Sequence, residues 1–224
     1  MSTRGTDAYQ DIDNLPGLVQ KAVRAARRHG FPSSCRPEQG RLLQLLAAGA
    51  PDRIGETGTG CGVGLAWLAS GASGDTSLVS VERDPDRARI AAEVFEGCDN
   101  VEVVHGDWSR IEDYGPFDLL VLDGGGQGKT KTGTGTGTGT GNETGGADDA
   151  DRAHCDTADP ARLLAPGGVV VIDDFTPVTA WPPRLGGEID LPRVHWLEHP
   201  ALHATELRLA PDLSAIVGTY LPAA

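Results

Sequence analysis

The chain has 224 residues, of which 39% are hydrophobic and 23% are charged. This length and composition are typical of one globular domain and short for two. The formal net charge of -13 repels phosphate backbones, so we expect no nucleic-acid partner. No apolar run approaches the roughly 20 residues that span a bilayer, and residues 1–14 contain no apolar signal segment. We therefore expect no association with membranes.

The cysteines are spread through the sequence without a C-x-x-C pair, at Cys35, Cys61, Cys98 and Cys155. This spacing favours reduced structural thiols over a disulfide framework or a zinc site. Together with the polar N-terminus, it predicts a cytoplasmic protein.

Two helices are expected before the first strand. Apolar residues at helical spacing predict a helix over residues 15–29, with Gly30 as its stop. A second helix is expected over residues 36–48, with Ser34 as its N-cap. We interpret residues 1–33 as an N-terminal helical segment and residues 34–224 as the main domain.

From residue 53 onwards, strands alternate with helices. Strands are expected at residues 53–57, 77–82, 101–105, 117–123 and 168–173, with helices at 64–70, 85–95 and 151–164. Nearly continuous Val, Leu and Ile runs suit parallel strands that are covered on both faces. Residues 204–209 and 215–220 are separated only by a short turn, which predicts an antiparallel hairpin. The fold class is therefore α/β, with a doubly wound, mostly parallel sheet.

A low-complexity segment interrupts this order. Residues 130–141 are almost a pure alternation of Thr and Gly. Such a sequence buries too little apolar surface to offset the entropy of ordering the chain. We therefore predict a disordered insertion over residues 124–149.

A glycine-rich turn follows the first strand, with the sequence Glu56-Thr57-Gly58-Thr59-Gly60-Cys61-Gly62. The dinucleotide pattern G-x-G-x-x-G would need glycine where Val63 stands. Glycines let the backbone approach a ligand closely at a strand-to-helix turn. The acidic Glu56 suits the ammonium group of a cationic cofactor such as S-adenosylmethionine better than a phosphate. A packing turn without a ligand is the alternative for this motif alone.

Polar side chains also follow the next two strands. Glu82 ends the second strand, where a carboxylate can accept hydrogen bonds from both hydroxyls of a ribose. After the third strand, Asp107 can accept from an adenine amino group and Trp108 can lie on the ring. Each residue alone could be a solvated strand end or a core residue. Their position at one edge of the sheet predicts a nucleoside site.

These motifs together carry a resemblance to a known family. The stretches are Pro37–Gly40, Glu56–Gly62, Val81–Asp84, Gly106-Asp107, Phe117–Asp123 and Leu164–Asp174. Over residues 37–220, apart from the insertion, the chain resembles class I S-adenosylmethionine-dependent methyltransferases. It looks most like their catechol O-methyltransferase-like branch of small O-methyltransferases. The resemblance implies a Rossmann-like seven-stranded sheet with a C-terminal antiparallel hairpin.

The resemblance also implies a cofactor and its ligands. S-adenosylmethionine would be bound by Glu56, Gly58, Gly60, Gly62, Glu82, Asp107, Trp108 and Asp123. A divalent cation, usually Mg²⁺, would be held by Asp123, Asp173 and Asp174. Carboxylate oxygens suit Mg²⁺, and a bound cation lowers the pKa of a substrate hydroxyl. The alternative is that Asp173 and Asp174 cap a strand end without a metal.

The catalytic base does not follow from the resemblance. The family has a lysine close after the fourth-strand aspartate, whereas this chain has Gly124-Gly125-Gly126. Lys129 is the nearest candidate for the base but borders the low-complexity insertion, so the base is unassigned, and Asp123 is a candidate catalytic residue. Trp181 follows the fifth strand and either walls an acceptor pocket or packs.

The sequence thus predicts an S-adenosylmethionine-dependent methyltransferase that transfers a methyl group to the hydroxyl of a small molecule. A non-catalytic S-adenosylmethionine-binding protein is the first alternative, because the base is unassigned. An NAD-dependent oxidoreductase is the second, and the glycine spacing counts against it. The expected partners are a small-molecule acceptor and, as a homodimer, a second copy of the chain.

Overall fold

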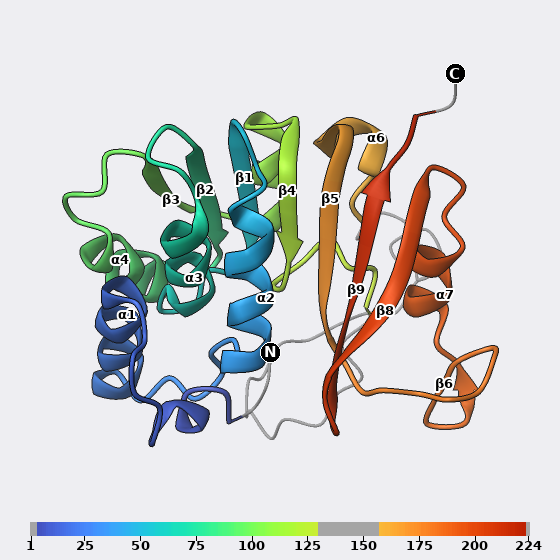
Figure 1. Ribbon diagram of the computed structural model, residues 1–224, viewed down its shortest axis with the longest axis horizontal. Coiled ribbons are helices and arrows are strands. Elements are labelled where there is room, and N and C mark those ends of the chain that lie inside the picture. Colours follow the sequence, from blue (N-terminus) through green and yellow to red (C-terminus); the bar gives the residue numbers. More distant parts are fainter. Residues whose placement is uncertain (1–3, 130–156, 223–224) are drawn as a thin grey trace, which may run out of the picture.

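The computed structural model describes residues 4–129 and 157–222. At its centre lies a seven-stranded sheet with the order β3-β2-β1-β4-β5-β9-β8 (Figure 1). Its strands are β1 (Arg53–Thr57), β2 (Ser77–Glu82), β3 (Val101–His105), β4 (Phe117–Leu122), β5 (Leu164–Phe175), β8 (Leu202–Ala210) and β9 (Leu213–Tyr220). The first five are parallel to one another, and β9 is antiparallel to both β5 and β8. The predicted doubly wound sheet and its C-terminal hairpin are confirmed.

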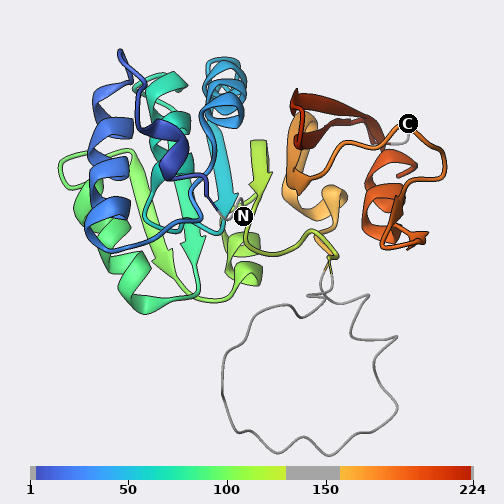
Figure 2. The ribbon, with the colours of Figure 1, turned by 90° about the horizontal axis from the view of Figure 1, so that it is seen from below.

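Helices cover both sides of this sheet (Figure 2). They are α1 (Gly17–Arg28), α2 (Pro37–Ala47), α3 (Val63–Gly71), α4 (Pro85–Val94), α6 (Pro160–Leu163), α7 (Leu191–Leu197) and the 3₁₀ turns η1 (Asp7–Tyr9) and η2 (Trp108–Asp113). Within the described ranges, none of these helices has the length and hydrophobicity needed to cross a bilayer.

The burial of strand β4 on both faces explains why its sequence is apolar without interruption from Leu119 to Leu122. Successive side chains of a strand point to opposite faces of the sheet. Leu119 and Val121 enter the core beneath α1, α2, α3 and α4. Leu120 and Leu122 enter a second core with residues of η2, α6 and α7. Since both faces are buried, no position in the middle of the strand is left for a polar residue.

The N-terminal segment is fastened to the sheet domain by buried hydrogen bonds. The Tyr9 hydroxyl donates to the Cys35 carbonyl at 2.8 Å and accepts from the Trp67 indole at 2.8 Å. Ser34 is buried, and its hydroxyl lies 2.7 Å from that of Thr6. Arg36, and not Ser34, occupies the N-cap position of α2. The predicted cap was wrong because Ser34 is engaged by a residue 28 positions earlier.

The predicted helix over residues 151–164 is shorter where the chain is described. Residues 151–156 lie outside the described part, and α6 spans only Pro160–Leu163 with Asp159 as its N-cap. The helix ends there because Leu164 already pairs with Phe117 as a residue of β5.

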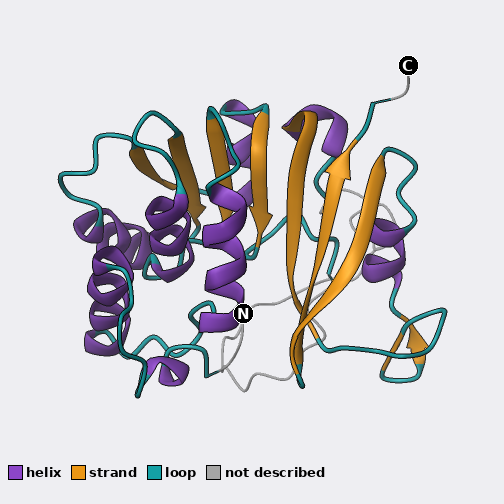
Figure 3. Cartoon of the chain, in the orientation of Figure 1, coloured by secondary structure: helices purple, strands orange, loops and turns teal. Residues whose placement is uncertain are grey.

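Between β5 and β8, the chain forms a small two-stranded ribbon, β6 (Arg184–Leu185) and β7 (Glu188–Ile189), and then α7 (Figure 3). Arg193 of α7 is 2% exposed and holds this region together. Its guanidinium donates to Asp190 at 3.0 Å, to both carboxylate oxygens of Glu206 at 3.0 Å, and to the Thr176 carbonyl at 2.9 Å. The loop after β5 is thereby tied to the C-terminal hairpin.

We expect Arg193→Ala to lower the free energy of unfolding by about 3 kcal/mol, because Asp190 and Glu206 would lose their buried counter-charge. Urea unfolding at neutral pH measures this change. Arg89→Ala is the matched control, since Arg89 pairs with Glu93 while both side chains are more than half exposed. It should cost less than about 1 kcal/mol. Equal losses in the two variants would contradict the structural role of Arg193.

Candidate functional site

The turn after β1 and the end of β4 approach each other so closely that the two residues in contact, Gly58 and Gly124, cannot carry side chains. The amide of Gly124 donates to the Thr57 carbonyl at 2.7 Å, and that of Asp123 donates to the same carbonyl at 3.1 Å. A Cβ atom on Gly58 would lie 2.5 Å from the Cα of Gly124, and one on Gly124 would overlap Gly58. Both positions therefore require glycine, and Asp123 is fixed beside the glycine turn.

The other two glycines of the turn have positive φ angles, +55° at Gly60 and +88° at Gly62. Left-handed backbone is easily adopted by glycine and rarely by residues with a side chain. Gly62 is the N-cap residue of α3. The amide of Gly60 donates to Oε2 of Glu82 at 2.8 Å, which links the turn to the end of β2.

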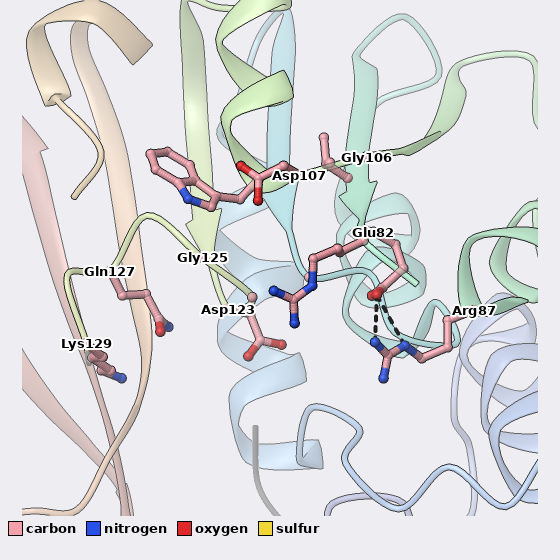
Figure 4. Close-up of a pocket in the computed structure, with 13 residues that line it drawn as sticks. Glu82, Arg87, Gly106, Asp107, Asp123, Gly125, Gln127 and Lys129 are labelled. Carbon is pink, nitrogen blue, oxygen red and sulfur yellow. Dashed lines mark hydrogen bonds and ion pairs between the residues drawn. The ribbon is translucent and has the colours of Figure 1, made fainter. Parts of the chain in front are cut away.

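A cavity of about 470 Å³ opens at the carboxyl ends of the parallel strands (Figure 4). Of the residues predicted for the site, it brings together Gly58, Glu82, Asp107, Trp108 and Asp123. Gly60 lines a smaller adjacent cavity, together with Asp123 and residues of the 31–35 segment. Glu56 and Gly62 line neither of these two cavities.

Trp108 excludes a side chain at Gly125 and Gly126, two of the three glycines that follow Asp123. Its side chain lines the cavity and packs on the glycine run after β4. A Cβ on Gly125 would lie 2.5 Å from the indole, and a Cβ on Gly126 would lie 3.0 Å from it. The space that a side chain would need is occupied by the indole. Asp107 is exposed and accepts a hydrogen bond from the Ser109 amide at 3.1 Å, which caps η2.

Glu56 lies behind the glycine turn and not in the large cavity. Its side chain is 2% exposed, and Oε2 accepts a hydrogen bond from the Ser80 hydroxyl at 2.5 Å. A side chain on Gly64 would overlap Oε1 of Glu56, so the glycine makes room for the carboxylate. Burial raises the pKa of Glu56 to about 8. The folded protein therefore holds a proton on this group at pH values where the unfolded chain has lost it.

This proton predicts a pH dependence of stability in the absence of ligands. Between the ordinary glutamate pKa of about 4.3 and about 8, the native state binds one more proton than the unfolded state. Stability contributed by Glu56 therefore falls as pH rises, by on the order of 1 kcal/mol per pH unit. Glu56→Gln should flatten the slope of unfolding free energy between pH 5.5 and 7.5, measured by urea titration. An unchanged slope in this variant would rule out a protonated Glu56.

Three carboxylates converge at the ends of β4 and β5. Asp123, Asp173 and Asp174 each offer an oxygen atom, and these atoms lie within 4.8 Å of one another. Burial and the charge of Asp173 raise the pKa of Asp123 to about 7, and burial also raises the pKa of Asp173. Oδ1 of Asp173 is buried and accepts no hydrogen bond from the described residues.

A backbone irregularity brings two consecutive carboxylates to one place. Asp174 has a φ of +61°, and the register between β5 and β9 shifts between Ile172 and Phe175. In regular strand geometry, neighbouring side chains would point to opposite faces. The irregularity lets both reach the cluster. Hard carboxylate oxygens in this arrangement fit a divalent cation, which would offset their mutual repulsion.

Lys129 reaches the same cluster from the chain after β4. Its ammonium group donates to the main-chain carbonyls of Asp173 and, at 3.1 Å, of Asp174. It also lies 3.8 Å from the centre of the Phe175 ring. Burial lowers the pKa of Lys129 to about 8. Lys129 also lines the large cavity, so it lies between this cavity and the carboxylate cluster.

The same segment contains a difference from the sequence-based expectation. The side-chain amide of Gln127 donates to the Leu122 carbonyl at 2.6 Å, and the main-chain carbonyl of Gln127 accepts from the Trp196 indole at 3.0 Å. Residues 124–129 are thus packed, although they belong to the predicted disordered insertion. Residues 130–149 of that prediction lie outside the described residues.

Sequence reasoning missed two residues of the site. Gln39 is 1% exposed on α2 and forms a side-chain hydrogen bond with Asp173. Its place in the Pro37–Gly40 motif was the available signal. Arg87 lines the cavity and pairs with Glu82 at 3.0 Å. Trp181, in contrast, is 60% exposed and does not line the large cavity.

Comparison with known proteins defines the class. A family model described as a methyltransferase domain matches residues 56–175, which is more than half of the chain. The chain therefore belongs to this family of methyltransferase domains.

Individual relatives are similar over part of their length. A putative O-methyltransferase of Mycobacterium ulcerans is 38% identical over 110 residues, covering 41% of this chain and 49% of the relative. A catechol O-methyltransferase of Niastella koreensis is 31% identical over 127 residues, covering 50% and 58%. The chain thus spans about half the length of the curated relatives it matches.

A solved structure shares the fold over nearly the whole chain. The O-methyltransferase from Bacillus cereus in complex with SAH superposes with a TM-score of 0.64. The sequences are 23% identical, and the match covers 96% of each chain.

Proposed function

We propose that this chain is an S-adenosylmethionine-dependent O-methyltransferase that acts on a hydroxyl group of a small molecule with the help of a divalent cation. The observation that carries the proposal is the position of Asp123. This residue lines the large cavity and also belongs to the carboxylate cluster. The proposed cofactor site in the cavity and the proposed cation site in the carboxylate cluster would thereby share the Asp123 side chain.

The cavity offers a place for each part of the cofactor. Glu82, at the end of β2, would bind the ribose hydroxyls, Asp107 the adenine amino group, and Trp108 the face of the ring. The backbone of Gly58, Gly60 and Gly62 would run close to the amino-acid end of the cofactor. Glu56, buried beneath this turn, would contribute negative charge near its ammonium group. The names of the relatives, which include a catechol O-methyltransferase, support this assignment.

Asp123, Asp173 and Asp174 would hold the cation. A bound cation supplies acidity to an acceptor hydroxyl. Gln39 would keep Asp173 in place through its side-chain hydrogen bond. Bound S-adenosylmethionine would supply the methyl group, which the acceptor oxygen would take from the sulfonium sulfur, leaving S-adenosylhomocysteine as the neutral thioether.

Lys129 would take the proton of the acceptor hydroxyl. Arg83 and Arg87 also line the cavity, but a guanidinium keeps its proton in proteins. Among the described residues that line the cavity, Lys129 therefore carries the one amine that can act as a base. Its contact with the carbonyls of Asp173 and Asp174 places it beside the proposed cation.

The metal dependence can be measured with labelled S-adenosylmethionine and a panel of catechols. We expect turnover with Mg²⁺ and its loss in EDTA, whereas S-adenosylhomocysteine should still bind in calorimetry. Asp173→Asn should lower turnover by about 100-fold, because the cation loses a charged ligand. Asp113→Asn, at an exposed carboxylate in η2, is the control. Full turnover in EDTA would overturn the metal part of the proposal.

The base can be tested separately. We expect both Lys129→Met and Lys129→Arg to lower kcat by about 100-fold or more at pH 7.5, since neither side chain can accept a proton. Affinity for S-adenosylhomocysteine should change little. Lys21→Met, which removes a lysine that donates to the Val94 carbonyl, controls for loss of charge. A Lys129→Arg variant with wild-type turnover would show that Lys129 is not the base.

The homodimer, the cytoplasmic location and the lack of a nucleic-acid partner stay predictions from the sequence.

A further inference from the structure

One of the two carboxylate oxygens of Glu82 has no acceptor position to spare. Its Oε2 accepts from the Gly60 amide at 2.8 Å, and its Oε1 accepts from the Asp84 amide at 2.9 Å. Oε1 also faces two N–H groups of Arg87, Nε at 3.2 Å and Nη2 at 3.0 Å. Each carboxylate oxygen has two lone pairs, so the three N–H groups of Asp84 and Arg87 fill Oε1, whereas Oε2 keeps one lone pair free. A ribose diol that donates one hydroxyl to each carboxylate oxygen therefore requires a present donor to leave Oε1.

Only one of the present donors can leave without unfolding its surroundings. The Gly60 amide belongs to the turn that enters α3, and Asp84 caps α4 by accepting from the amides of Asp86 and Arg87. The Arg87 guanidinium, by contrast, ends a flexible side chain that is 32% exposed. Figure 4 shows it reaching across to Glu82 at the rim of the cavity.

The surroundings of Arg87 offer it a second position. Its guanidinium lies 3.7 Å from Asp84 and 5.6 Å from the centre of the Phe31 ring. A neighbouring cavity of about 430 Å³, lined by Arg87, Phe31 and Asp84 among others, lies beside it. The guanidinium can therefore give up Glu82 while it keeps a carboxylate and an aromatic face.

We propose that Arg87 is a competitor for the ribose subsite, which occupies Glu82 in the cofactor-free protein and must move aside when the ribose diol binds. This inference rests on the proposed function in one respect, the assignment of Glu82 to the ribose. Arg87 thereby sets the affinity for cofactor and product. The free energy needed to separate Arg87 from Glu82 is subtracted from that of binding.

The test is calorimetry of S-adenosylhomocysteine with Arg87→Gln. Because the ion pair is only partly buried, we expect binding to become tighter by about fivefold. Arg89→Gln removes the same charge from the same helix, where Arg89 pairs with Glu93, and should leave the affinity unchanged. Urea unfolding of each variant shows that the compared proteins are equally folded.

A second measurement separates competition from a general effect on the fold. Adenosine and 2′,3′-dideoxyadenosine are titrated into the wild type and into Arg87→Gln. The gain in affinity of Arg87→Gln over the wild type should appear for adenosine. It should vanish for the dideoxy compound, which has no ribose hydroxyls to donate to Glu82. Equal or weaker binding of S-adenosylhomocysteine by Arg87→Gln, or an equal gain for both nucleosides, would overturn the role of Arg87 alone. Failure of the wild type to bind S-adenosylhomocysteine would overturn the proposed function together with it.

Discussion

The contact between Gly58 and Gly124 is the constraint on which the site depends. Two parallel strands normally diverge into loops that carry side chains, but here the backbones touch and exclude a Cβ on either side. The turn after β1 therefore lies directly against the end of β4. Asp123, whose amide donates a hydrogen bond to the Thr57 carbonyl, is held at the boundary between the large cavity and the carboxylate cluster.

This geometry has an electrostatic consequence. Glu56, Asp123 and Asp173 are brought close together in a buried region, and burial raises the pKa of each. Isolated buried carboxylates favour their neutral form, whereas a cation or an ammonium group favours the charged form. The acidic core of the site is thus prepared to bind positive charge, which suits a sulfonium cofactor and a divalent metal. Lys129, Arg83 and Arg87 bring positive charge to the lining of the cavity, where a ligand would compete with these side chains or use them.

Much of the fold was predictable from the sequence because the strands are buried on both faces. The apolar runs of β4 and β5 mark a covered parallel sheet, and the short turn before residue 215 marks the hairpin. The acidic strand ends were predictable for a related reason, since the carboxyl ends of parallel strands share one edge.

What the sequence did not reveal depends on contacts between distant segments. Ser34 has the character of an N-cap, but Thr6 engages it from 28 residues away. The glycines after Asp123 suggested the start of a disordered insertion, because composition does not record that Trp108 packs on them. Arg87 has no motif of its own, and its relevance became visible only through its pairing with Glu82.

A crystal structure of the protein with S-adenosylhomocysteine and Mn²⁺, recorded with anomalous data, tests most directly whether the cofactor and the cation bind side by side in one site. We expect one anomalous peak coordinated by Asp123, Asp173 and Asp174, and a ribose whose hydroxyls both donate to Glu82. A nucleoside bound away from Glu82, or Mn²⁺ absent from these three carboxylates at saturating concentration, would contradict the proposed arrangement.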